Sequence, residues 1–289
     1  MDKRKTGGMI RILVILIIGF FSFESYLLAQ YTIRGTIKNA ANQTLYLENM
    51  FAQQFTLVDT IKLDSMGGFT MEGQLSEDAI LRLRIGKVHS WWLILEKGMY
   101  DVEVNLNRFR KDKYNIKGSA SSTTLYNYFK KQRAFLQKMQ MAKRKLYEIK
   151  AKQEAAQANQ ELLSSESRNI ALEEIQNHKD KVFSLSEEYF NFLKSYIDTS
   201  KSLTAVIAAE SLPAEQFPTY LRKAIKQMKK EFNNSKYVIH LEKTIEHKLK
   251  LIIGAEAPEI ELKSPEDKII KLSSLRGKYV LIDFWASWC

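Results

Sequence analysis

The feature that most constrains this fold is a change of hydrophobic period near residue 119. Between residues 31 and 118, apolar and polar residues alternate in short runs such as 32–37. Alternation with period two is typical of strands that bury one face. From Ser121 onward, apolar residues recur every three or four positions, which predicts helices. The chain is therefore expected to be a multidomain α+β protein, in which a β domain precedes a helical part.

The β domain is predicted to span residues 30–118 as an antiparallel sheet or sandwich with one solvent-exposed face. Gly67 and Gly68 are expected to supply the positive φ of a hairpin turn. Trp91 and Trp92 are neighbours in a predicted strand, so one is expected in the core and the other on the outer face. The predicted strands are 32–37, 44–48, 60–63, 69–72, 80–85, 91–95 and 100–106.

Residues 119–251 are predicted to form a helical arm or spacer. Two long helices joined near residue 160 are expected to fold back as an antiparallel hairpin. One apolar stripe contains Leu125, Phe129, Leu136, Met139, Leu146 and Ile149, and the other contains Val182, Leu185, Tyr189, Leu193 and Tyr196. Three shorter helices are expected at 200–210, at 214–232 after Pro213, and at 235–250 before Gly254.

The N-terminus, residues 1–29, has the pattern of an export signal. Basic Lys3, Arg4 and Lys5 precede an apolar run at 10–23, and Ala29 offers a cleavage point. The run is shorter than the roughly 20 apolar residues that a spanning helix needs. The chain is therefore expected in the periplasm or cell envelope, with membrane contact only through this segment, whether it is cleaved or retained as an anchor.

The formal net charge of +11 raises the question of a nucleic-acid or membrane partner. The lysines alternate with apolar residues at helical spacing, which favours a solvated helix face, and export argues against nucleic acid. His240 and His247 share a predicted helix face but form no complete ligand set, so no metal is expected. The sequence contains no phosphate-binding glycine loop, so no cofactor is expected.

Residues 252–289 carry the candidate chemistry. Segments 260–263 and 268–272 predict a hairpin, and 273–278 predicts one helical turn ended by a glycine. The apolar run 279–285 is expected to be a central strand buried on both faces. Asp283 lies within this run, and a carboxylate buried in a central strand is a functional candidate.

Three motifs carry a family resemblance: Gly254-x-x-Ala257-Pro258, Leu272-x-x-Leu275-x-Gly277-Lys278 and Asp283-Phe284-Trp285-Ala286-x-Trp288-Cys289. Together they resemble the start of a TlpA/ResA-type thioredoxin-like domain, the domain of envelope thiol-disulfide oxidoreductases. This resemblance implies that 252–289 is the first, incomplete part of an α/β domain. Gly35, Asp59-Thr60 and Gly67-Gly68 resemble a DUF4369 domain, which precedes such oxidoreductases in many Gram-negative envelope proteins.

The resemblance implies a role for each matching residue. Cys289 matches the attacking cysteine of Trp-Cys-x-x-Cys, and Asp283 matches the acid that exchanges a proton with the thiols. Trp285 and Trp288 match the aromatic wall that contacts the substrate. The partners implied are protein thiols and disulfides of the envelope. The resolving cysteine would fall at position 292, so this polypeptide is expected to trap partners as mixed disulfides without turnover.

Two other functions stay open from the residues. A peroxiredoxin-like (AhpC/TSA) protein shares the lead-in, but its motif requires a proline and a threonine where this chain has Ile282 and Ala286. The second alternative is a non-enzymatic envelope binding module, made of the β domain and the arm with a remnant thioredoxin segment.

Overall fold

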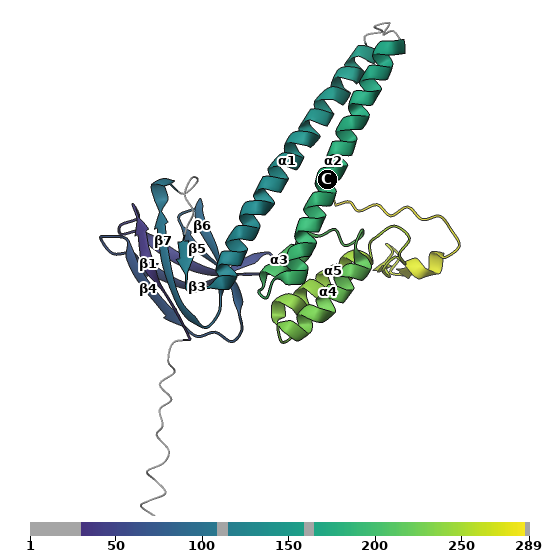
Figure 1. The fold of residues 1–289 in the computed structure, drawn as a ribbon. Helices are drawn as coiled ribbons and strands as arrows, with labels where there is room; N and C mark the ends of the chain where they lie inside the picture. Colours follow the sequence, from purple (N-terminus) through teal and green to yellow (C-terminus); the bar gives the residue numbers. More distant parts are fainter. Residues whose placement is uncertain (1–29, 109–114, 159–164, 287–289) are drawn as a thin grey trace, which may run out of the picture.

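The structure, a computed structural model, describes residues 30–108, 115–158 and 165–286. Figure 1 shows a β domain, a long helical hairpin, a group of shorter helices and a C-terminal segment that extends beyond α5 (Lys236–Leu249). Over these ranges, no helix combines the length and the apolar character needed to cross a bilayer. The expected export signal lies outside the described residues.

The β domain contains two four-stranded sheets, ordered β4-β1-β7-β8 and β3-β2-β5-β6. Neighbouring strands run antiparallel except β1 and β7, which are parallel and place Tyr31 beside Gly98. The domain is thus mixed, which corrects the antiparallel expectation, because the chain leaves the first sheet and returns to it beside β1. The strands are β1 (Tyr31–Lys38), β2 (Thr44–Phe51), β3 (Gln54–Lys62), β4 (Gly68–Gly73), β5 (Ala79–Ile85), β6 (His89–Leu95), β7 (Gly98–Asn105) and β8 (Asn115–Lys117), with the 3-10 turn η2 (Leu106–Arg108) between the last two.

Alternate residues of both sheets supply one shared apolar core. Ile33, Leu47 and Leu83 are completely buried within it. Trp91 is 1% exposed in this core, whereas Trp92 is half-buried on the opposite face of β6. The expected division between the two tryptophans is therefore confirmed.

The turn around Gly67 differs from the expected hairpin. Gly67 has the predicted positive φ of 83°, and the Asp64 carboxylate accepts the backbone N–H groups of Met66 and Gly68 at 2.7 Å. However, β3 and β4 lie in different sheets, so this turn is a crossover. A two-residue hairpin turn is found instead at the preceding connection, between β2 and β3. Its residues Ala52 and Gln53 have φ values of 52° and 61°.

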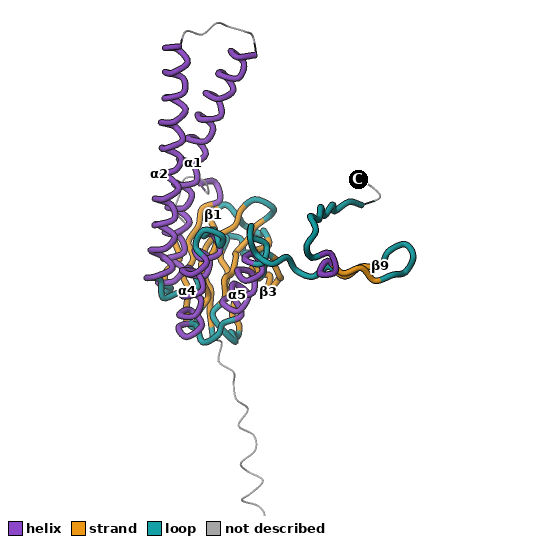
Figure 2. Tube along the Cα trace, turned by 90° about the vertical axis from the view of Figure 1, so that its right-hand side faces the viewer, coloured by secondary structure: helices purple, strands orange, loops and turns teal. Residues whose placement is uncertain are grey.

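The two long helices are α1 (Ala120–Ala158) and α2 (Ser165–Thr199), as the periodicity predicts. They form an antiparallel hairpin that projects from the body (Figures 1 and 2). At 1.5 Å per residue, the 39 residues of α1 extend for about 58 Å. Along each helix, the residues that are buried or half-buried recur at spacings that alternate between four and three positions. This is the heptad pattern of a coiled coil. These seam residues are Tyr128, Gln132, Phe135, Met139, Ala142, Leu146 and Ile149 on α1, and Ile175, His178, Val182, Leu185, Tyr189, Phe192 and Tyr196 on α2.

Aromatic rings and one polar network fix the base of the arm. The Tyr128 ring stacks on Phe192 at 5.6 Å between centroids and meets Tyr196 edge-on at 5.2 Å. Gln132 Nε2 donates hydrogen bonds to the hydroxyl oxygens of Tyr128 at 2.9 Å and Tyr189 at 3.0 Å. Burial raises the pKa of Tyr128 well above its ordinary value, so the phenol stays neutral in this seam.

Three shorter helices complete the body: α3 (Thr204–Ser211), α4 (Pro218–Glu231) and α5 (Lys236–Leu249). The second begins at Pro218, four residues later than expected, because Pro218 and not Pro213 occupies the first helical turn. Ser235 caps α5 by accepting the N–H of Tyr237 at 3.3 Å. Helix α3 is apolar on all sides and buried, so it lies between the arm and α5 as a core element.

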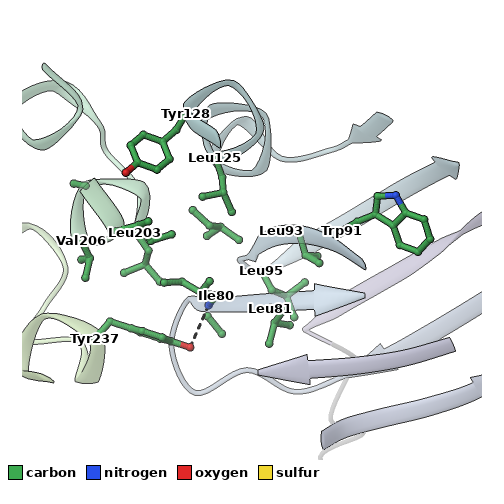
Figure 3. Packing of buried hydrophobic residues seen from close by; sticks show 14 of the residues in the cluster. Ile80, Leu81, Trp91, Leu93, Leu95, Leu125, Tyr128, Leu203, Val206 and Tyr237 are labelled. Carbon is green, nitrogen blue, oxygen red and sulfur yellow. Dashed lines mark hydrogen bonds between the residues drawn. The ribbon is translucent and has the colours of Figure 1, made fainter. Parts of the chain in front are cut away.

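Tyr237 connects the helical part to the β domain. Figure 3 shows its side chain reaching from α5 to the backbone of β5. The hydroxyl oxygen accepts the N–H of Ile80 at 3.1 Å and donates to Asn49 Oδ1 at 2.7 Å. The β domain and the short helices are therefore joined by a buried polar contact as well as by apolar packing.

A Tyr237→Phe chain is expected to lose about 1–2 kcal/mol of unfolding free energy, because the buried N–H of Ile80 then has no acceptor. Denaturant unfolding measures the loss, and faster amide hydrogen exchange at Ile80 locates it. The control is Tyr147→Phe, since the Tyr147 side chain is exposed on the arm. Equal stability of the two variants would contradict a role for this hydroxyl.

Candidate functional site

The segment that carries the thioredoxin-like motifs begins with a small hairpin. Strands β9 (Glu261–Lys263) and β10 (Ile269–Lys271) pair antiparallel, with Ile270 opposite Leu262. The 3-10 turn η3 (Leu272–Leu275) follows, and Gly277 has a φ of 83° just after it. The hairpin, the helical turn and the glycine stop are all at the predicted positions.

Hydrogen bonds tie this turn to the chain that precedes the hairpin. The Glu259 carboxylate accepts the N–H of Ser273 at 3.0 Å, and Arg276 forms an ion pair with Glu256. Hydrogen bonds from Ser273 hold the pKa of Glu259 below its ordinary value. The lead-in to the motif is thus fixed by polar contacts at its surface.

The apolar run at 279–285 is not a strand in this structure. It has no regular secondary structure and no sheet partner among the described residues, and Leu281 is 95% exposed. The expectation of a buried central strand is therefore wrong, because a central strand needs neighbouring strands on both edges. Val280 and Ile282 are each 42% exposed and line an open cleft of 900 Å³ beside Leu249 at the end of α5.

The four predicted site residues are placed differently. Asp283 is exposed, and the Trp285 side chain is 75% exposed. Trp288 and Cys289 lie outside the described residues. Of the four predicted site residues, the structure therefore places only Asp283 and Trp285, and both are exposed. Over the described ranges, no group of three or more His, Cys, Asp or Glu side chains is arranged to hold a metal ion.

A second cluster, on the outer face of β2 and β5, is absent from the sequence predictions. Glu48 is only 7% exposed and accepts hydrogen bonds from Arg82 Nε at 2.8 Å and Arg84 Nε at 2.9 Å. The Arg82 guanidinium lies 3.4 Å from the Phe55 ring centroid, and that of Arg84 lies 4.3 Å from the Tyr46 ring. We call these five residues the Glu48 cluster.

The Glu48 cluster is arranged for stability more than for catalysis. Its single carboxylate is engaged by two guanidinium groups, which hold its pKa below the ordinary value although burial alone would raise it. The aromatic rings cover the flat faces of both arginines. The sequence shows one acidic residue in β2 and two arginines at alternate positions of β5, but it does not show that they are neighbours, because this depends on the pairing of Glu48 with Arg82.

The comparisons with known proteins bear on the N-terminal part. Residues 31–125 match the family model described as a domain of unknown function, DUF4369. No curated protein and no solved structure matches the chain. The match begins at the first residue of β1 and ends in the first turns of α1, so it includes every strand of both large sheets. Residues 31–125, which hold the Glu48 cluster, are therefore a DUF4369 domain.

Proposed function

We propose that the chain takes part in thiol-disulfide exchange in the cell envelope, with Cys289 as the attacking thiol of a thioredoxin-like segment at 252–289. The observation that carries this proposal is the run Asp283-Phe284-Trp285-Ala286-x-Trp288-Cys289. The β9–β10 hairpin and η3 precede it in the order of the domain that it resembles, which supports the proposal. The export pattern of residues 1–29 supports the location.

The reaction proposed is a single exchange step. The Cys289 thiolate attacks one sulfur of a partner disulfide, the partner S–S bond breaks, and a new S–S bond joins the partner to Cys289. The other partner sulfur leaves as a thiolate and takes a proton from solvent, and the Asp283 carboxylate is the group proposed to take up the proton of the Cys289 thiol. Two sulfur atoms stay oxidised throughout, so no further oxidant or reductant is required. The exposed Trp285 ring offers a surface for the partner polypeptide.

The test uses the reduced full chain and insulin as the disulfide probe. We expect a mixed disulfide with Cys289, released by dithiothreitol and absent from Cys289→Ser. We also expect Asp283→Asn to move the pH profile of Cys289 alkylation by iodoacetamide about one unit downward, because it removes a like charge that disfavours the thiolate. Mass spectrometry measures both products.

The matched control is Asp267→Asn, in the turn between β9 and β10. It removes the same charge from the same segment and is expected to leave the alkylation profile unchanged. Alkylation that follows the profile of a free cysteine, and that neither aspartate affects, would contradict the proposed site. That result would favour the binding-module alternative.

A further inference from the structure

Six large apolar side chains are exposed on the distal part of the arm. Two of them, Met141 and Ile170, lie on another side of the arm. The other four are Leu136 and Tyr147 on α1 and Leu172 and Phe183 on α2, with exposed fractions between 45% and 74%. A solvated helical hairpin has no need of such residues outside its seam, so their arrangement decides whether they form a surface. We call these four residues the apolar ladder.

The heptad register places the apolar ladder on one side of the arm. With the seam residues Gln132 and Ile175 at position a, Leu136 and Leu172 occupy position e, and Tyr147 and Phe183 occupy position b. Positions b and e lie next to each other on a helix, and in an antiparallel pair the e positions of the two helices face the same side. All four side chains therefore share one face.

The same register gives the spacing of the ladder. The ring of Tyr128 contacts that of Tyr196, and the ring of Phe135 contacts that of Tyr189. In both pairs the two residue numbers have the same sum. A residue of α1 and a residue of α2 whose numbers have this sum therefore lie at the same level of the hairpin. On this scale Phe183 is level with Met141, and Leu172 is level with Lys152. The four side chains then alternate between α1 and α2 at steps of about 8 Å along the arm.

The lower end of this face is already an interface within the molecule. Phe129 precedes Leu136 by one heptad, and its ring contacts Trp92 of β6 at 5.9 Å. Phe190 follows Phe183 by one heptad, and its ring meets Phe217 beside α4 at 5.3 Å. The β domain and α4 cover the face near the base, and the apolar ladder continues it beyond them. Because the body projects on this side, a flat bilayer does not fit along the face.

The charges on this face have one predominant sign. Arg133, Lys143 and Lys150 occupy positions b and e of α1, and Lys179 occupies position e of α2. From the level of Arg133 to the level of Glu154 along the arm, Glu154 itself is the one acidic residue at positions b and e of the two helices. Among the described residues, none of the four basic groups forms an ion pair. A second copy presenting the same face would bring like charges together, so the face is suited to an acidic partner.

We propose that the apolar ladder binds an acidic amphipathic helix of a partner protein as a third helix of the arm. The apolar stripe of that helix would cover Leu136, Tyr147 and Phe183, and its flanking Asp and Glu residues would lie near Lys143, Lys150 and Lys179. This role is independent of thiol exchange at Cys289. It concerns only the arm, which remains intact in a Cys289→Ser chain.

The test uses the full chain in its Cys289→Ser form and a designed peptide of about 21 residues, with Leu at positions a and d and Glu at e and g. We expect binding by isothermal titration calorimetry, and we expect Tyr147→Glu with Phe183→Glu to weaken it at least about 30-fold. The matched control is Met141→Glu with Ile170→Glu, which adds the same charge at exposed apolar residues of position c. That control is expected to change affinity by less than about threefold.

Several results would overturn the proposal. They are absence of peptide binding, an equal loss in the two double variants, and equal binding of a peptide with Lys in place of Glu. Vesicles of phosphatidylglycerol and phosphatidylcholine at a 3:7 ratio form the other arm of the test. Vesicle binding that depends on Tyr147 and Phe183, without peptide binding, would assign the face to a membrane surface instead. Circular dichroism of each variant confirms that the arm remains helical.

Discussion

Gly35→Ala is expected to remove about 3 kcal/mol or more from the unfolding free energy of the β domain. A Cβ atom at Gly35 would lie 1.8 Å from the carbonyl oxygen of Val102, on the neighbouring strand β7. The contacted atom belongs to the backbone and cannot rotate away, so β1 and β7 must separate. This parallel pair forms the centre of the first sheet, and losing its register exposes the core residues on both strands.

Denaturant unfolding monitored by tryptophan fluorescence measures this effect, since Trp91 lies in the same core. The matched control is Gly86→Ala, where nothing lies within 4 Å of the added Cβ and the φ of 60° is the only obstacle. That substitution is expected to cost about 1 kcal/mol, the strain of a left-handed alanine. Equal losses at Gly35 and Gly86 would show that close strand approach is not what requires glycine at Gly35.

The strands were predictable from sequence because alternation is a local property of the chain. Each of the seven predicted runs overlaps an observed strand, β1 to β7. Their pairing was not predictable, because it depends on which apolar faces meet in the core. Gly67 has the backbone conformation expected of a turn, yet the chain crosses there to the other sheet. Ala52-Gln53 makes the actual hairpin without the Asn-Gly signal of such turns.

The helices show the same division between local and distant information. On α2, the predicted stripe residues Val182, Leu185, Tyr189 and Tyr196 lie in the seam, whereas Leu193 is completely buried outside it. On α1, however, Phe129 packs on Trp92 outside the seam and Leu136 is 45% exposed. An apolar residue in a helical pattern indicates a face, but the sequence does not say which partner covers that face. The exposed Asp283 has the same cause, since its expected burial depended on neighbouring strands.

Glu48→Gln is expected to lower the unfolding free energy by about 3 kcal/mol at neutral pH. The substitution keeps the size of the side chain but removes the carboxylate that Arg82 and Arg84 share, and the side chains of these two arginines are only 19% and 24% exposed. Removing one member of a buried ion pair is costly because the remaining charge stays in a poorly solvated place. The control is Glu103→Gln, whose ion pair with Lys38 is about 60% exposed on both sides. Its expected cost is below about 0.5 kcal/mol.

The same pair of chains gives a pH test of the Glu48 cluster. Burial alone would raise the pKa of Glu48, but the hydrogen bonds from Arg84 and Arg82 outweigh it and hold the pKa below the ordinary value of 4.5. A carboxyl whose pKa is lowered by folding stabilises the fold above its unfolded pKa, and this contribution is lost as the pH falls through the folded pKa. The difference in unfolding free energy between wild type and Glu48→Gln is therefore expected to be constant from pH 7 to about 5 and to shrink below about 4.5. Denaturant titrations across this range measure this difference.

A difference that does not change on acidification would mean that the charge of Glu48 does not hold the two arginines. Packing of Phe55 and Tyr46 on their guanidinium groups would then keep the cluster together instead.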